Sequence, residues 1–224
     1  MDKGKIRSYT TKEIQDLACQ YFKRHFPHYP DQIDIPLDIE LLIEKDGHLI
    51  SDIPDFIGQR IGQEGLLLWN KTLEKYDICI VKRYLDPQKN YLNRYRFTLG
   101  EELGHLILHA EYFKNLSFQS DAINFYSSLS NEEIHRIDRE ARIFAANILV
   151  PYPIIWDEAK KLVENLKDEK KKFLNYNDFE GHCANDLASL FEVSSESMKY
   201  RFYNTGIERG LLKPKYYEYF NKDN

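Results

Sequence analysis

One predicted helix, Thr98–Ala110, limits the fold of this chain more than any other segment, because its two adjacent faces differ in chemistry. With about 100° between successive residues, leucine, isoleucine and alanine side chains fill one arc, which must face a core. The neighbouring arc carries carboxylates and imidazoles rather than the lysine and arginine that are typical of a purely solvated face. The residues on that arc are Glu101, Glu102, His105 and His109. The chain must therefore fold around a helix that is apolar on one side and carries metal-binding or proton-transferring groups on the other.

The spacing of these polar residues favours a metal site. Glu101 and His105 are four residues apart, so both can bind one cation from the same face of the helix, and the Glu102 carboxylate beside them can reach a water on that cation. This is the layout of the zinc-protease motif H-E-x-x-H, with Glu101 in place of the first histidine. His109 forms a second such pair with His105, as an alternative ligand or as a residue that supports the ligands. On these residues alone, a solvated acidic helix with a hydrogen-bonded histidine is the competing interpretation.

The composition favours a soluble cytoplasmic protein. Hydrophobic residues make up 42% and aromatic residues 14% of the 224 residues, which is enough for a packed core. The formal net charge of −5 argues against nucleic-acid binding by bulk charge, and no apolar run approaches the roughly 20 residues that span a bilayer. The first residues lead into a charged segment rather than a signal peptide, and Cys19, Cys79 and Cys183 are too scattered for a disulfide scaffold.

The order of the remaining segments predicts an α+β fold that is mainly helical. Two helices precede three strand-like runs, at His48–Ile53, Gly65–Trp69 and Asp77–Tyr84, which predict a small antiparallel sheet. We place the start of the second helix at Pro36 and interpret Phe113–Ser130 as a long surface loop. Helices dominate the rest of the chain.

The C-terminal part is predicted to be a helical extension, residues 161–224, packed on a domain of residues 1–160. Within it, residues 185–202 have the pattern of a helix-turn-helix, with a serine N-cap before the second helix. The positively charged residues of that second helix are Lys199 and Arg201, and two such residues are few for binding the phosphates of DNA. We therefore favour a structural helix pair or a docking surface for a protein over direct DNA binding.

Two ordered motifs resemble the signatures of the ImmA/IrrE-type metallopeptidase family. Residues 96–109 read R-F-T-L-G-E-E-L-G-H-L-I-L-H, which resembles that family's R-F-T-L-A-H-E-L-G-H-L-L-L-H. Residues 140–151 read E-A-R-I-F-A-A-N-I-L-V-P, which is similar to its second signature, E-A-N-x-F-A-A-E-L-L-M-P. The resemblance extends over about residues 10–155 and implies a zincin-like metallopeptidase domain.

Carried onto this chain residue by residue, the resemblance implies a role for the acids and histidines of the two motifs. Glu101 stands at the first metal ligand, Glu102 at the catalytic base, His105 at the second ligand and Glu140 at the third. A divalent metal bound there lowers the pKa of a water, and Glu102 takes a proton from that water and passes it to the leaving amine. Two carboxylates and one imidazole neutralise the charge of the ion, which predicts weaker hydrolysis than two imidazoles and one carboxylate give. Zinc is the expected metal, with manganese or iron as alternatives because oxygen is a hard ligand.

These implied roles have an electrostatic consequence. If Glu101, Glu102 and Glu140 converge, three carboxylates share a partly buried space with one neutral imidazole. Their repulsion and desolvation raise at least one pKa sharply unless a cation is present. We therefore expect either a bound divalent ion or a proton shared between carboxylates.

The resemblance further implies a cytoplasmic endopeptidase that hydrolyses a peptide bond of a protein. Members of the family act on helix-turn-helix repressors in mobile genetic elements and stress responses, so such a repressor is the expected substrate. The alternative is a member with weak or no activity that binds a repressor or another protein through the same cleft. A DNA-binding regulator, suggested by the C-terminal pattern alone, is the third hypothesis.

Overall fold

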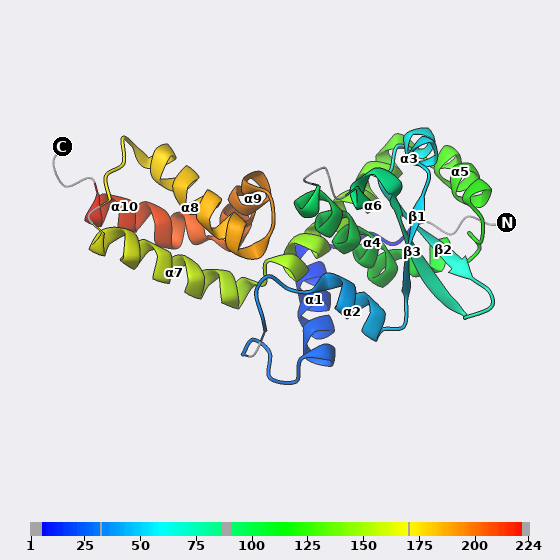
Figure 1. Ribbon diagram of the computed structural model, residues 1–224, viewed down its shortest axis with the longest axis horizontal. Coiled ribbons are helices and arrows are strands. Elements are labelled where there is room, and N and C mark those ends of the chain that lie inside the picture. The colour runs from blue at the N-terminus through cyan, green and yellow to red at the C-terminus, as the bar shows by residue number, and fades with distance from the viewer. Residues whose placement is uncertain (1–5, 32, 87–90, 170, 221–224) are drawn as a thin grey trace. The chain divides into compact units, whose positions relative to one another are not determined.

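The chain forms two compact units in the computed structural model, which describes residues 6–31, 33–86, 91–169 and 171–220 (Figure 1). The first unit comprises Met1–Tyr29 and Asp38–Ile148, and the second comprises Pro30–Leu37 and Leu149–Asn224. The units divide at Ile148, whereas the sequence suggests a boundary at residue 160, which stays a prediction.

The first unit is mainly helical and contains a small sheet, which confirms the predicted α+β class. Its helices are α1 (Thr11–His25), α2 (Ile39–Lys45), α3 (Asp55–Ile61), the 3-10 turn η1 (Lys82–Leu85), α4 (Leu92–Phe113), α5 (Gln119–Ser128) and α6 (Asn131–Leu149). Its strands are β1 (Leu49–Ile53), β2 (Gly65–Asn70) and β3 (Lys75–Val81). The Thr10 hydroxyl and the Glu13 carboxylate form a capping box at the start of α1, because each satisfies a backbone N–H of the first turn.

The sheet is mixed, so the prediction of an antiparallel sheet is wrong for one of its two strand pairs. The strand order is β1-β3-β2, with β2 antiparallel to β3 and β1 parallel to β3. The parallel register pairs Leu49 with Asp77 and Ile53 with Val81. Parallel neighbours need a crossover connection, and here α3 and β2 together provide it.

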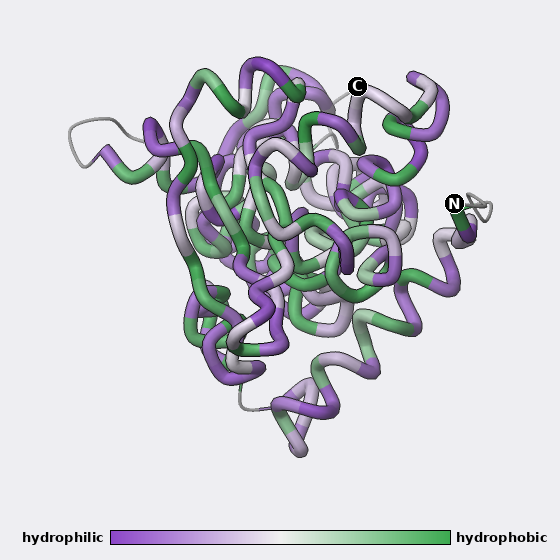
Figure 2. The backbone as a smooth tube through the Cα atoms, turned by 90° about the vertical axis from the view of Figure 1, so that its right-hand side faces the viewer, coloured by the Kyte–Doolittle hydropathy of each residue, from purple (hydrophilic) through white to green (hydrophobic). Residues whose placement is uncertain are grey.

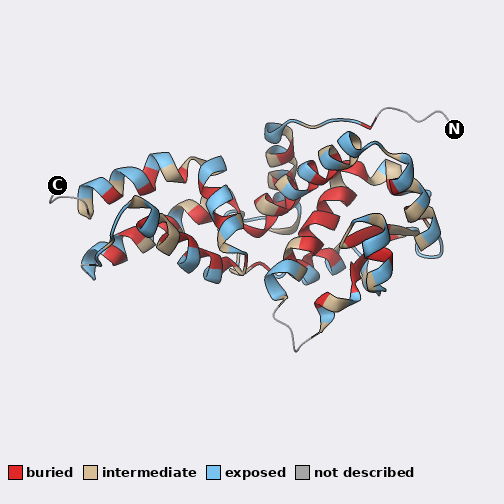
Figure 3. Cartoon of the chain, turned by 90° about the horizontal axis from the view of Figure 1, so that it is seen from above, coloured by how far each residue is buried: buried red, intermediate tan, exposed pale blue. Residues whose placement is uncertain are grey.

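Helix α4 forms the core of the first unit and packs directly against α6. Residues 98–106 are buried at every position, and buried residues are drawn in red in Figure 3. A Cβ added at Gly104 would lie 2.7 Å from the carbonyl oxygen of Ala141, and one added at Gly100 would lie 3.1 Å from the Cβ of Ala145. The two helices therefore run antiparallel with their backbones in close approach, and glycine is required at the crossing.

Two local predictions are corrected by the structure. The segment Phe113–Ser130, expected to be a loop, contains helix α5, whose start is capped by Asp121 accepting the backbone N–H of Phe118. Its polar and aromatic residues hide the helical period, since Ala122 and Tyr126 alone are buried on it. Helix α2 begins at Ile39 rather than at Pro36, because Asp38 is its N-cap and accepts the backbone N–H of Leu41.

The second unit is a set of helices, as predicted: α7 (Tyr152–Asp168), α8 (Tyr176–Phe191), α9 (Ser195–Thr205), the π-helical turn η2 (Glu208–Leu212) and α10 (Lys213–Tyr219). Helices α8 and α9 form the helix-turn-helix-like pair. Glu192 adopts a left-handed conformation (φ 51°) at the turn, Val193 is buried, and Ser194 caps α9. The backbone tube of Figure 2 shows hydrophilic (purple) and hydrophobic (green) residues following one another along its helical turns. None of the described helices combines the length and the apolar character that crossing a lipid bilayer requires.

Candidate active site

Two glutamates of α4 reach a cavity in the first unit. The cavity has a volume of about 320 Å³. It is bordered by α3, the start of β2 and the arginines of three different elements, and its wall includes Gly58, Gly65, Arg83, Arg94, Glu101, Glu102 and Arg142. Both glutamates are almost fully buried, at 7% exposed for Glu101 and 4% for Glu102, so the space beyond them is their remaining access to solvent. We call this space the first-unit cavity.

Glu101 forms an ion pair across the two packed helices. The Arg142 guanidinium on α6 donates from Nε to Glu101 Oε1 at 2.8 Å. Burial raises the pKa of Glu101, and the positive charge of Arg142 opposes that shift. The carboxylate that sequence places at the first ligand position is therefore already paired with a cation of the chain.

Glu102 lies against the backbone of β2. A Cβ on Gly65 would approach Glu102 Oε1 to 2.5 Å, so glycine at the start of the strand leaves room for the carboxyl group. Among the described residues, Glu102 Oε2 has no hydrogen-bond partner although it is buried. Burial, with the neighbouring charges of Glu101 and Asp138, raises the pKa of Glu102 well above its ordinary value. A buried carboxyl with a raised pKa and one unused oxygen is suited to accept and release a proton.

Asp138 on α6 is a site residue that the sequence reasoning missed. Its Oδ1 lies 3.7 Å from His105 Nε2, and its Oδ2 accepts a hydrogen bond from Gln63. Within the described ranges, Oδ1 has no hydrogen-bond partner, and burial raises the pKa of Asp138. The available signal was spacing, since Asp138 precedes Arg142 by one helical turn and shares its face. We call Glu102 Oε2 and Asp138 Oδ1 the open oxygens.

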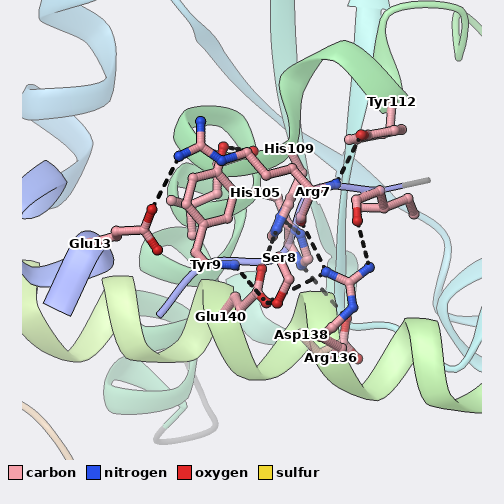
Figure 4. Close-up of polar contacts among 12 residues, drawn as sticks. Arg7, Ser8, Tyr9, Glu13, His105, His109, Tyr112, Arg136, Asp138 and Glu140 are labelled. Carbon is pink, nitrogen blue, oxygen red and sulfur yellow. Dashed lines mark hydrogen bonds and ion pairs between the residues drawn. The ribbon is translucent and has the colours of Figure 1, made fainter. Parts of the chain in front are cut away.

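Glu140 contacts His109 and the residues that precede α1 (Figure 4). Its Oε2 is 3.1 Å from His109 Nε2, and its Oε1 accepts from Ser8 and from the backbone of Tyr9. Among the described residues, no hydrogen bond or ion pair joins Glu140 to Glu101 or His105. The predicted ligand set of Glu101, His105 and Glu140 stays a prediction.

The two histidines link these groups. His105 Nδ1 and His109 Nδ1 are 3.3 Å apart, and both side chains are 1% exposed. Burial lowers the pKa of His105 well below its ordinary value and also lowers that of His109, although Glu140 opposes the shift at His109. Both imidazoles are therefore neutral near pH 7, which is the form that binds metals.

Tyr126 on α5 is a second residue that sequence reasoning missed. Its side chain is buried, and the charges of Glu102, Asp138 and Glu101 add to burial in raising the pKa of its phenol well above the ordinary value. The phenol thus stays protonated beside the carboxylates. The sequence carried no signal for it, because the pattern of its segment indicated a loop.

The sequence matches a known peptidase family over more than half of its length. Residues 84–203 match the IrrE N-terminal-like domain of peptidase family M78. The chain belongs to this family. No curated protein matches it. The matched M78 region includes α4 and α6, and therefore every acid and histidine described above that lies on those helices.

The M78 family implies a divalent metal, and the side chains near His105 are of the chemical kind that binds one. No three histidine, cysteine or acidic side chains of the described residues stand at ligand distance from a common point. The open oxygens nevertheless lie in the same buried cluster as the neutral His105, since the charge of Asp138 acts on Glu102. Buried carboxylate oxygens without a partner carry a large desolvation cost, which a cation or a proton relieves.

Proposed function

We propose that this M78-family protein is a metal-dependent endopeptidase whose active site is the inner end of the first-unit cavity. The observation that carries the proposal is Glu102, a buried carboxyl with a raised pKa and an unpartnered oxygen at the cavity wall. The matched family is a peptidase family, and a cavity beside the start of β2 suits a segment of a protein substrate.

The residues that would hold the metal are His105 through Nε2, Asp138 through Oδ1, and Glu101. Glu140 is the alternative third ligand, as the sequence motif implies. A divalent ion in such a site polarises a peptide carbonyl and lowers the pKa of a water. Zinc is the first expectation, and the excess of carboxylate donors also suits manganese or iron.

Glu102 moves the proton in this proposal. Its Oε2 would accept a proton from the attacking water and return it to the leaving amine, and burial, which raises the pKa of Glu102, makes the carboxyl a stronger base for the first step. Gly65 has no side chain, which leaves room for the Glu102 carboxyl group against the strand. Tyr126 stays neutral behind the carboxylates and adds no charge to the cluster.

The proposed substrate is a protein, with a helix-turn-helix repressor of a mobile genetic element or a stress response as the first candidate. The cytoplasm is the proposed compartment, and the three cysteines of the described residues are free thiols, which is compatible with a reducing environment. His109 supports the ligands rather than binding the metal itself in this proposal.

A specific observation favours a second function, that of an inactive member that binds a protein partner through the same cavity. Glu101 and Arg142 both depart from the family signatures, which have histidine and asparagine at these positions, and the two departures form an ion pair with each other. An arginine that neutralises Glu101 reduces the need for a metal at that position.

Cleavage of a candidate repressor separates the two functions. A candidate helix-turn-helix repressor is co-expressed with the wild type and with Glu102→Gln, which keeps the shape and removes the base. We expect cleavage by the wild type, none by Glu102→Gln, and repressor binding by both. Glu111→Gln, on the exposed end of the same helix, is the matched control and cleaves normally. Binding without cleavage by the wild type, in zinc and in manganese, supports the inactive member instead.

A further inference from the structure

An extended segment before α1, residues Ile6–Thr10, lies over the buried pair of His109 and Glu140 (Figure 4). We call it the N-terminal arm. It is fixed at points that do not involve Glu140: the Arg7 N–H donates to the Tyr112 hydroxyl, and the Tyr9 hydroxyl donates to the carbonyl of Leu108. The Arg136 guanidinium donates to the carbonyls of Ile6 and Arg7. The position of the arm is thus set by α4 and α6.

The arm supplies donors to a carboxylate that no solvent reaches. Glu140 is 0% exposed. Its Oε1 accepts from the Ser8 hydroxyl at 3.2 Å and from the Tyr9 N–H at 3.2 Å, and Arg136 lies 3.5 Å from the same oxygen. Its Oε2 faces His109 Nε2 at 3.1 Å. With Oε1 occupied by the arm, Oε2 is held toward the imidazole.

These contacts determine which nitrogens carry hydrogen. An ionised carboxylate accepts and does not donate, so His109 Nε2 carries the hydrogen and its Nδ1 is a lone pair. His105 Nδ1, at 3.3 Å from that lone pair, must then be the donor. This leaves His105 Nε2 as a lone pair directed toward Asp138 Oδ1. The 3.7 Å between these two atoms is too long for a hydrogen bond, which agrees with two acceptors facing each other.

We propose that the N-terminal arm is a positioning element: Ser8 and Tyr9 hold Glu140, Glu140 orients His109, and His109 fixes His105 in the tautomer whose Nε2 is free to bind a metal. The metal part of this inference rests on the proposed function, whereas the tautomer part does not. Ligating histidines generally depend on a partner at the other ring nitrogen, and here that partner is a second histidine connected to the arm.

The tautomers of the metal-free, full-length protein test the arm directly. Two-bond ¹H–¹⁵N spectra of the imidazoles distinguish Nδ1–H from Nε2–H. We expect His105 as the Nδ1–H form and His109 as the Nε2–H form in the wild type. Ser8→Ala raises the population of the other His105 tautomer, and Ser8→Thr, which keeps the hydroxyl, restores the wild-type spectrum. An Nε2–H form of His105 in the wild type, or identical spectra for Ser8→Ala, overturns the proposal.

Zinc affinity, measured by titration calorimetry on the same variants, tests the consequence. Loss of one hydrogen bond at this distance from the ligand weakens zinc binding by about 3- to 10-fold in Ser8→Ala, and Ser8→Thr returns it. Ser51→Ala is the matched control, because it removes a serine hydroxyl contact, to Cys79, on strand β1 and leaves affinity unchanged. Equal affinity of Ser8→Ala and wild type contradicts the proposal. If the wild type binds neither zinc nor manganese, the proposed function fails, and the tautomers alone decide on the arm.

Discussion

The buried carboxylates on the two sides of the α4–α6 crossing differ in whether all of their oxygens have hydrogen-bond partners. On one side lie the open oxygens of Glu102, which borders the first-unit cavity, and of Asp138. On the other side, both oxygens of Glu140 have partners, from His109 and from the N-terminal arm. The same pair of helices therefore carries one acidic cluster that is incomplete and one that is complete.

This difference separates a binding role from a holding role. Buried polar atoms are nearly always hydrogen-bonded, and the exceptions cost stability unless a ligand uses them. The cavity side keeps such exceptions and is suited to take up a cation or a proton. On the arm side both oxygens of Glu140 have partners, so this side is suited to fix the positions of side chains.

The largest expected effect is a loss of stability when the Glu140 carboxylate, whose two oxygens both have partners, is removed. Glu140→Ala leaves His109, Arg136 and the arm donors without their acceptor, so we expect the first unit to lose about 3–5 kcal/mol of unfolding free energy. Urea unfolding followed by Trp69 fluorescence, in a Trp156→Phe background, reports this unit. Glu111→Ala is the control on an exposed site and changes little. A loss below about 1 kcal/mol for Glu140→Ala would show that the arm side is not a stabilising network.

The next effect concerns metal and decides which acid is the ligand. At zinc concentrations a hundredfold above the dissociation constant, binding stabilises the wild type by about 2.7 kcal/mol, seen as a rise in melting temperature. We expect Asp138→Asn to abolish most of that rise and Glu140→Gln to retain part of it, because Asp138 faces His105 and Glu140 acts through His109. If Glu140→Gln instead loses more of the rise than Asp138→Asn, Glu140 is the ligand, and the carboxylates on both sides of the crossing form one metal site. No rise in the wild type, with zinc or with manganese, would remove the metal from the proposed function.

A smaller effect, of opposite sign, is expected on the incomplete side. Glu102→Gln removes a buried charge and should raise the unfolding free energy of the metal-free protein by about 1–2 kcal/mol at pH 8. The folded pKa of Glu102 is raised above its ordinary value of 4.5, so its contribution to stability is most favourable below that pH and falls as the pH rises through the folded pKa. The advantage of Glu102→Gln should therefore vanish near pH 4. Urea unfolding of both proteins at a series of pH values checks this, and a pH-independent difference would mean that the carboxyl does not ionise there.

Much of the fold could be predicted because its signals are local. The capping box of Thr10 and Glu13, the α4 period and the three strands depend on neighbouring residues. The parallel pairing of β1 with β3 could not be predicted, since it depends on where the crossover through α3 returns the chain. Helix α5 was missed because its buried face is limited to Ala122 and Tyr126.

Part of the candidate site could not be predicted either, because it depends on how α4 and α6 cross. The spacing of the α4 motif predicts that Glu101, Glu102 and His105 lie in one region. Asp138 and Glu140 are two residues apart, which is about 200° around a helix, so they point to different sides. Asp138 faces His105 and Glu140 faces His109, and this pairing depends on the crossing at Gly104 and Ala141, which no motif on α6 alone encodes.

The smallest expected effect is the coupling free energy between Glu101 and Arg142. Both residues border the first-unit cavity, and they form an ion pair with each other. Arg142 is half-exposed, so solvent screens the pair, and a double-mutant cycle with Glu101→Gln and Arg142→Asn should give a coupling of about 0.5–1 kcal/mol in the metal-free protein. If the ion pair takes the place of a metal contact, Arg142→Asn also tightens zinc binding, because it releases the Glu101 carboxylate to the ion. Arg139→Asn, on the exposed face of the same helix, controls for the loss of a positive charge near the site. Unchanged or weaker zinc binding in Arg142→Asn alone would place Glu101 outside the ligand set, leaving His105, Asp138 and the open oxygen of Glu102 to define the cavity side.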